Sequence, residues 1–113
     1  MHEIGIIQGA LELALQSAQA SAATQIHCVR LRVGAMTGLV PEALQFAFEA
    51  LREGTMAAKA TLEVETVPAR CWCRDCEVEF ESADWLQECP RCHRGGAELR
   101  HGLELEVASM EVT

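Results

Sequence analysis

The sequence predicts an α+β fold in which two helices pack on one face of a three-stranded mixed sheet, with a module of short β-hairpins inserted. Three observations support this prediction. Two segments repeat apolar residues with a helical period, three segments alternate apolar and polar residues as strands do, and five of the six cysteines fall within residues 69–101. We therefore expect one domain at residues 1–68 plus 102–113 and a second domain at residues 69–101.

The first helix is expected over residues 3 to about 22. Its apolar residues recur at steps of three and four and form one stripe, made of Ile4, Ile7, Leu11, Leu15 and Ala18. The second helix is expected from about Pro41 to Arg52, because proline suits the first helical position and Gly54 suits the residue just past the end. Its expected buried face is Leu44, Ala47, Phe48 and Leu51.

Strands are expected over residues 26–34, 60–67 and 102–112. On the first strand Val29, Leu31 and Val33 should face inward, and the inward sets of the other two are Leu62 with Val64, and Leu103 with Leu105 and Val107. A helix lies between the first two strands, which permits a parallel crossover and hence a mixed sheet.

The outward positions of these strands carry opposite charges. The first strand presents Arg30 and Arg32, whereas the other two present Glu63 with Glu65, and Glu104 with Glu106. Cross-strand pairs of opposite charge stabilise a sheet by roughly 0.2–1 kcal/mol each, which favours the arginine strand in the middle. The alternative, that these side chains are simply solvated, stays open from the sequence.

Charge and cysteine use restrict the class of protein. The 17 acidic residues exceed the 9 basic ones, giving a formal charge of −8, which disfavours binding to a phosphate backbone. No signal-like or membrane-spanning stretch is present, so we expect a cytoplasmic protein whose cysteines are thiols and metal ligands.

Two C-x-x-C pairs predict a structural zinc site. Cys73 and Cys76 form the first pair, Cys89 and Cys92 form the second, and twelve residues separate them. Two intervening residues let each pair fold as a tight knuckle, and four thiolates complete a tetrahedral shell with no open position for water or substrate. A redox C-x-x-C would need a thioredoxin-like frame, which is missing. A rubredoxin-type iron site uses the same four sulfurs, and spacing alone does not distinguish the two ions.

Three other metal-binding side chains need an interpretation. Cys71 precedes Cys73 too closely to replace it in a knuckle, and His93 directly follows Cys92. We expect both to be bystanders. Cys28 is expected to be an ordinary buried thiol.

The whole chain resembles the HypA-type hydrogenase maturation (nickel-incorporation) proteins. The resemblance rests on Met1-His2-Glu3 opening a helix, on the α/β body, and on a two-knuckle zinc ribbon inserted before the last strand. It implies a nickel metallochaperone that binds Ni(II) as transient cargo at its N-terminus and delivers it to the [NiFe]-hydrogenase large-subunit precursor. The implied partners are that precursor and a HypB-type GTPase, and some relatives also serve urease maturation.

By the same resemblance, His2 is the nickel ligand and Glu3 supports it. A histidine at position two offers its imidazole, its own amide nitrogen and the amine of Met1, a planar nitrogen set that suits Ni(II). Zn(II) at the four cysteines would then be purely structural.

The sequence also bears on two other classes of function. A zinc-ribbon module that binds protein or nucleic acid is the alternative, since Arg70, Arg74, Arg91, Arg94 and Arg100 lie near the knuckles. An enzyme is not expected, because G-x-S-x-G, phosphate-loop and H-E-x-x-H motifs are absent. His27 and Cys28 are adjacent on a strand and so point to opposite faces, and His101 is expected to be structural.

Overall fold

The computed structural model describes residues 3–82 and 86–113. Its contacts divide the chain into two compact units. Unit 1 comprises residues 1–32, 39–65 and 105–113, and unit 2 comprises residues 33–38 and 66–104. The elements in chain order are α1 (Glu3–Ala20), β1 (Ile26–Gly34), the short 3₁₀ helix η1 (Ala35–Thr37), α2 (Pro41–Leu51), β2 (Thr61–Val67), β3 (Arg70–Cys73), β4 (Val78–Glu81), β5 (Glu98–His101) and β6 (Leu105–Val112).

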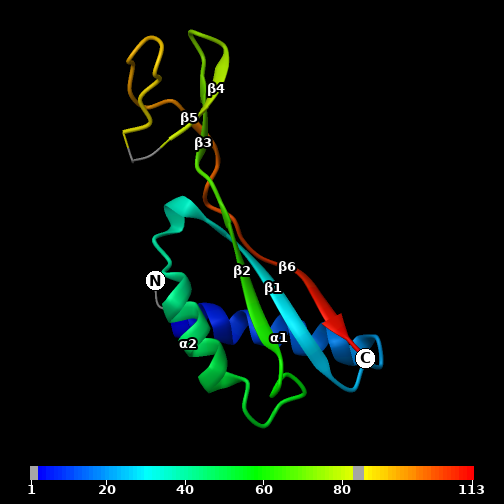
Figure 1. Cartoon of the computed structure of the whole chain (residues 1–113). Coiled ribbons are helices and arrows are strands. Elements are labelled where there is room, and N and C mark those ends of the chain that lie inside the picture. The colour runs from blue at the N-terminus through cyan, green and yellow to red at the C-terminus, as the bar shows by residue number, and fades with distance from the viewer. Residues whose placement is uncertain (1–2, 83–85) are drawn as a thin grey trace. The chain divides into compact units, whose positions relative to one another are not determined.

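Unit 1 is built on a sheet with the strand order β2-β1-β6 (Figure 1). The ion pairs across the strands give their directions. Arg30 and Arg32 on β1 meet Glu63 and Glu65 in ascending order on β2, so these strands are parallel. The same arginines meet β6 in the reverse order, Glu111 and then Glu106, so β6 is antiparallel to β1. The mixed three-stranded sheet is as predicted, and the arginine strand is the central one, which is the order that the charge pattern favoured without deciding it.

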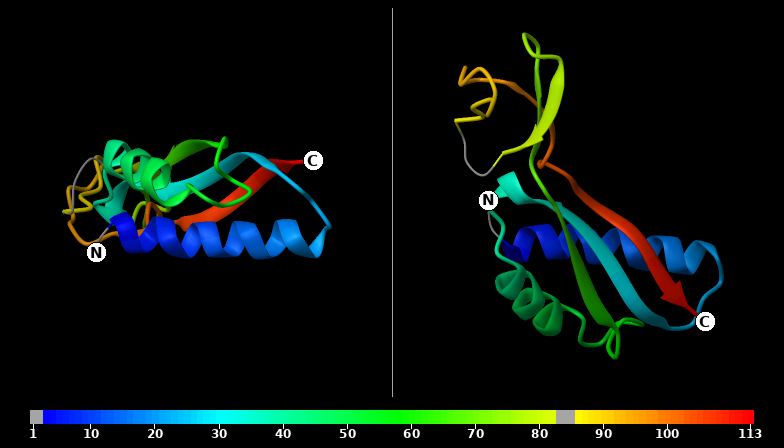
Figure 2. Two further views of the ribbon diagram at one scale, coloured as in Figure 1. Left: turned by 90° about the horizontal axis from the view of Figure 1, so that it is seen from below. Right: turned by 45° about the horizontal axis from the view of Figure 1, so that its top comes forward.

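The apolar face of this sheet packs against α1 and α2. Leu31 and Val33 on β1 are buried, while Arg30 and Arg32 on the same strand point to the opposite, charged face. α1 runs along the sheet (Figure 2) and buries a stripe made of Ile7, Leu11, Ala14 and Ala18. α2 buries Leu44, Ala47 and Phe48, and Pro41 stands at its start. Ile4 was expected on the buried stripe, but it is 60% exposed, and the stripe begins at Ile7.

Unit 2 contains a second sheet, antiparallel, with the order β4-β3-β5. Central β3 pairs Cys71 with Phe80 on β4 and with Leu99 on β5. Its small core consists of Cys71, Cys73, Phe80 and Cys89, with the half-buried side chains of Val78 and Leu99 packed against it. The predicted α+β class, with a separate hairpin module carrying the cysteines, is confirmed.

Two backbone segments of unit 2 cross at glycines. A Cβ on Gly34 would lie 2.1 Å from both the carbonyl carbon and oxygen of Gly102, so only glycine fits at position 34. Gly102 has φ of +128°, a conformation that favours glycine. Two hydrogen bonds join the segments at this crossing. The Met36 N–H donates to the Gly102 carbonyl, and the Gly34 N–H donates to the Glu104 carbonyl, both at 2.8 Å.

This crossing explains why the last expected strand is shorter than predicted. Residues 98–101 belong to β5, and β6 begins only at Leu105, because the backbone turns at Gly102. Leu103 was expected to face inward, but it is 59% exposed.

None of the described helices combines the length and the apolar character that crossing a bilayer requires.

Candidate metal centre

The first cysteine pair folds as a tight turn at the end of β3. Cys73 is the last residue of β3, and Glu77, the residue after Cys76, has a left-handed backbone with φ of 53°. The Glu77 N–H donates to the Cys73 carbonyl at 2.8 Å. The chain therefore reverses around the two cysteines, and both sulfurs lie at the same end of the hairpin.

The second pair repeats this geometry. His93, the residue after Cys92, has φ of 61°, and its N–H donates to the Cys89 carbonyl at 2.8 Å. The two knuckles share this backbone arrangement although their intervening residues differ, Arg-Asp in one and Pro-Arg in the other. The C-x-x-C spacing alone therefore accounts for the local shape.

The four sulfurs converge. All four Sγ atoms lie within 4.8 Å of one another, and Sγ of Cys73 lies 3.7 Å from Sγ of Cys92. A tetrahedral ion with Zn–S bonds of about 2.3 Å places its sulfurs about 3.8 Å apart. No cysteine is in a disulfide, so all four sulfurs are available as ligands. The donor set fits a structural metal ion with a closed coordination shell.

The four thiols are not equivalent. Cys73 and Cys89 are buried, Cys76 is half-buried and Cys92 is exposed. Backbone N–H groups of Cys92 and Arg91 stabilise the Cys89 thiolate and lower its pKa to about 7. Burial and the neighbouring sulfurs raise the pKa of the Cys76 thiol to about 12. In the metal-free cluster, therefore, Cys89 ionises readily and Cys76 keeps its proton.

Contacts outside the four cysteines hold the knuckles together. The Arg94 guanidinium donates to the carboxylate of Asp75, which joins the second knuckle to the first. The Arg91 N–H lies 3.4 Å from Sγ of Cys89 and donates to it. These two contacts were not predicted from the sequence. Opposite charges in the two knuckles were the only signal for the Asp75–Arg94 pair.

Cys71 and His93, which were expected to be bystanders, lie outside the group of four sulfurs. Cys71 is fully buried in the unit 2 core, and burial raises the pKa of its thiol. His93 pairs with Glu88, with Nδ1 3.4 Å from the carboxylate. Among the described residues, the group that could hold a metal ion contains the four cysteines and neither Cys71 nor His93. Cys28 is buried on β1.

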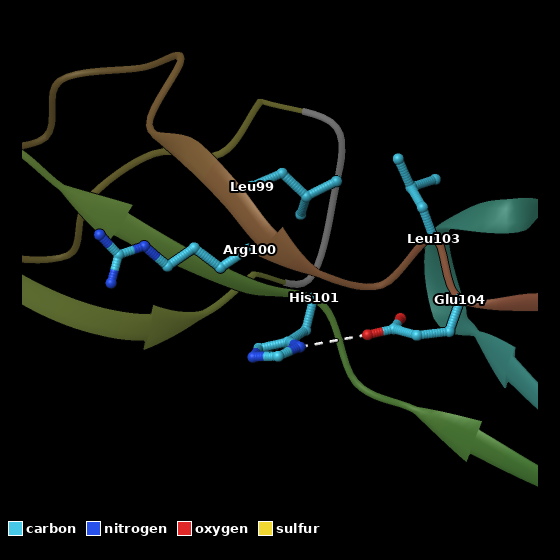
Figure 3. Close-up of a pocket in the computed structure, with 5 residues that line it drawn as sticks. All are labelled: Leu99, Arg100, His101, Leu103 and Glu104. Atoms are coloured by element: carbon cyan, nitrogen blue, oxygen red, sulfur yellow. Dashed lines mark hydrogen bonds and ion pairs between the residues drawn. The ribbon is translucent and has the colours of Figure 1, made fainter.

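A cavity of about 210 Å³ lies beside the end of β5 (Figure 3) and is lined by Leu99, Arg100, His101, Leu103 and Glu104. Nδ1 of His101 lies 3.1 Å from the Glu104 carboxylate, whose other oxygen accepts the Gly102 N–H at 2.7 Å. Burial alone would raise the pKa of Glu104, but the backbone N–H groups of Gly102 and Glu104 and the side chain of His101 hold it below its usual value. The polar groups of His101, Gly102 and Glu104 are thus hydrogen-bonded to one another, and we interpret the arrangement as structural, the role expected for His101.

Of the predicted nickel ligands, Glu3 is the one that lies among the described residues. Met1 and His2 lie outside the described residues. Glu3 is the first residue of α1 and is half-buried. Nickel coordination by these three residues therefore stays a prediction.

The fold and this centre define a class: a small two-unit α+β protein that carries a four-cysteine structural metal module. A family model described as hydrogenase/urease nickel incorporation, metallochaperone, hypA, matches residues 1–112. The chain belongs to the HypA family, the non-catalytic nickel metallochaperones of hydrogenase maturation.

Individual relatives match along almost the whole chain. The hydrogenase maturation factor HypA of Picosynechococcus sp. is 42% identical over 112 residues, which is 99% of each chain. The HypA of Rhizobium leguminosarum bv. viciae is 36% identical over the same length. The solution structure of the Ni metallochaperone HypA from Helicobacter pylori has a TM-score of 0.71 at 24% identity, covering 99% of this chain and 97% of that one, and supports the fold.

Proposed function

We propose that this chain takes up Ni(II) at its N-terminus and delivers it to the large-subunit precursor of a [NiFe]-hydrogenase. The ligands are the imidazole and amide nitrogen of His2 and the terminal amine of Met1, with Glu3 in support. The observation that carries this proposal is the full-length family match from residue 1, together with the Met1-His2-Glu3 start. Three nitrogens in fused chelate rings are a donor set that suits square-planar Ni(II).

The position of Glu3 supports its role. Because Glu3 opens α1, its carboxylate lies at the positive end of the helix dipole. A metal cation placed just before the helix would meet an unfavourable field of about 0.3–1 kcal/mol, and a carboxylate at that end offsets it.

We assign Zn(II) to Cys73, Cys76, Cys89 and Cys92, where it only stabilises the fold, while Ni(II) is transient cargo. The nickel-binding domain is then residues 1–68 plus 102–113, and the zinc-ribbon domain is residues 69–101. The sulfur geometry supports this assignment, since four thiolates leave no position through which cargo could enter or leave.

The proposed partners follow from the proposed cargo. They are the hydrogenase large-subunit precursor, a GTPase of the HypB kind that acts in the same delivery, and proteins of urease maturation. We place the protein in the cytoplasm, where thiols stay reduced and can hold a metal ion.

Nickel titration of untagged protein tests this function. We expect one Ni(II) per chain, bound with an affinity that falls as pH decreases, since the terminal amine (pKa about 7.7–8.0) and imidazole (about 6.5) must lose protons. The variant His2→Ala, and a chain with one extra residue before Met1, should each lose this binding while keeping one zinc by mass spectrometry.

His27→Ala is the matched control, because His27 is an exposed histidine bonded to the Thr113 hydroxyl at 3.0 Å and is far from residue 2 in the sequence. It should bind nickel as the native chain does. Equal nickel affinity for the native and the extended chains would exclude the amine as a ligand. If the native chain itself failed to take up Ni(II), the proposed delivery would be wrong.

The alternative, a nucleic-acid-binding ribbon, rests on five arginines near the knuckles, of which three already have partners within unit 2. Arg70 pairs with Glu79 at 2.9 Å, Arg94 pairs with Asp75, and Arg100 lies over the ring of Trp72 at 4.5 Å. These guanidinium groups are already engaged within unit 2, and the chain carries a formal charge of −8. We expect no shift of DNA or RNA in a gel mobility assay at low salt.

A further inference from the structure

Unit 1 has an apolar groove between α1 and β6. Two adjoining hollows, of about 240 and 600 Å³, run along the two elements. The α1 side is formed by Ile6, Ala10, Leu13 and Ser17, and the β6 side includes Leu105, Val107 and Met110. Leu13 is 61% exposed and Leu105 is 39% exposed, so the groove presents large apolar side chains to solvent.

β6 is an edge strand. It is the last strand in the order β2-β1-β6, and in Figure 1 it lies beside β1 at one side of the sheet. One row of its backbone N–H and C=O groups is therefore unpaired with any described strand. Such an edge is a template for an added strand unless something covers it.

Two glycines on α1 widen the groove without serving the fold. Gly5 and Gly9 line one of the hollows, and a Cβ added to either would have no atom within 4 Å. Glycine within a helix is unfavourable relative to alanine. No contact with a described residue requires these glycines, but a backbone entering the groove would use the space that they leave.

The charges on the outer face of the sheet indicate which side chains a partner strand beside β6 would carry. Across this face the strands carry glutamates on β2, arginines on β1 and glutamates on β6. Arg30 forms ion pairs with both Glu63 and Glu111, and Arg32 forms ion pairs with both Glu65 and Glu106. Two arginines thus face four carboxylates, which leaves an excess of negative charge on this face that a basic strand beside β6 would offset.

The residues of β6 that face this charged side are known from their contacts. Arg32 reaches Glu106, while Arg30 reaches both Ser109 and Glu111. In a regular strand, side chains on the same face are two residues apart. Glu106 and Ser109 are three residues apart, so β6 has an irregularity of one residue between them. Val107 and Met110, which are half-buried, face the groove.

We propose that the β6 edge and the α1–β6 groove dock an extended segment of a partner polypeptide whose residues alternate between apolar and basic. Its backbone pairs with β6, its apolar side chains enter the groove, and its Lys or Arg side chains meet Glu106 and Glu111. A second copy of this chain fits poorly, because pairing β6 with itself would set glutamates against glutamates. The inference is independent of nickel binding.

The probe is a synthetic peptide of eight residues, Lys-Val-Arg-Val-Lys-Val-Arg-Val, titrated into ¹⁵N-labelled, zinc-loaded full-length protein. We expect amide shift changes and slowed hydrogen exchange along residues 105–112, with further shifts along the groove side of α1. Leu13→Asp should weaken peptide binding by at least about tenfold, because it places a charge in the apolar groove. Gly9→Leu should weaken it by a similar factor, because the larger side chain fills the groove.

Phe46→Asp is the matched control, since Phe46 is an equally large apolar side chain, 75% exposed, on α2 outside the groove. It should bind the peptide as the native chain does. A peptide with Glu at the basic positions, and one with proline at its two central valines, should not bind. Gly9→Leu guards against misfolding, because a Cβ at this position would have no atom of a described residue within 4 Å.

Three results would overturn the proposal. Shifts spread over all acidic surfaces, with the proline peptide binding equally well, would indicate attraction by net charge alone. Unchanged binding in both Leu13→Asp and Gly9→Leu would exclude the groove. Concentration-dependent dimers with shifts along β6 in the absence of peptide would make a second copy the occupant.

Discussion

Single residues decide the chemistry of the metal centre. The sulfurs are placed by the left-handed backbone at Glu77 and His93 and by the hydrogen bonds that these residues donate to Cys73 and Cys89. Neither residue is a glycine, so both knuckles hold a conformation that L-residues adopt rarely. The free energy of metal binding offsets this local cost, as it does in other small metal-stabilised modules.

The unequal thiol pKa values give a pH dependence. In the metal-free cluster the pKa of Cys76 is raised to about 12, so near neutral pH zinc must displace its proton. Zinc affinity should therefore fall as pH decreases, by about tenfold per pH unit for each proton released. Competition with a zinc-binding dye at several pH values measures this slope, and an indicator in weak buffer counts the protons.

The contrary outcome would be a zinc affinity that stays constant between about pH 8 and pH 6, because it would mean that all four thiols are ionised before the metal arrives. Cys28→Ser is a suitable control. Cys28 lies on β1 and is not among the four clustered sulfurs, so this variant should show the same slope.

At this scale the sequence predicts the sulfur cluster well. The C-x-x-C spacing sets each knuckle locally, and the structure brings the four sulfurs together as expected. The ion pair between Asp75 and Arg94 was not predictable, because the two residues are nineteen positions apart in the sequence and come into contact only when both knuckles have formed. The identity of the ion, and the nickel ligands Met1 and His2, stay predictions.

At the scale of elements, the glycine crossing is the most sensitive point. Gly34→Ala would place a Cβ 2.1 Å from the Gly102 carbonyl group and 2.5 Å from the Leu103 nitrogen, all backbone atoms that cannot move aside alone. We expect a loss of about 1–3 kcal/mol in the free energy of unfolding. Urea denaturation followed by circular dichroism measures it.

Gly9→Ala is the matched control for this substitution. It adds the same methyl group inside α1, where nothing lies within 4 Å, and should raise the free energy of unfolding by about 0.5–1 kcal/mol. If the two variants changed stability in the same direction, the close approach of Gly34 and Gly102 would not be the determining contact.

The elements themselves were largely predictable. β1 spans Ile26–Gly34, and α2 spans Pro41–Leu51, because the alternation and the proline–glycine boundaries are strong local signals. The end of the chain was harder. A single apolar alternation runs through Leu103 and Leu105, but the backbone turns at Gly102 and residues 102–104 belong to neither strand, which separates β5 from β6. The groove was also not predictable, since it depends on how far α1 covers β6.

At the scale of the whole molecule, the two units should lose structure separately. Unit 1 has its own apolar core around Ile7, Leu31 and Phe48, whereas the core of unit 2 consists mostly of cysteines. A module of roughly forty residues rarely folds without a metal or disulfides. Removal of the metal with a strong chelator should therefore unfold unit 2 and leave unit 1 folded.

Trp72 lies half-buried on β3 of unit 2, so its fluorescence reports the folding of this unit. On chelation we expect a red-shifted emission, with retained helical circular dichroism from α1 and α2. Added zinc should reverse the change. A simultaneous loss of the helical signal would mean that the two units unfold as one.

The crossing at Gly34 also bears on protein engineering. Residues 33–38 belong to unit 2 although residues 39–65 separate them from its main segment, and the Met36 N–H donates to the Gly102 carbonyl. A graft that transplanted only residues 66–104 into another scaffold would leave that carbonyl without its donor. A portable version of the thiolate module therefore has to be assembled from both fragments, joined by a designed linker.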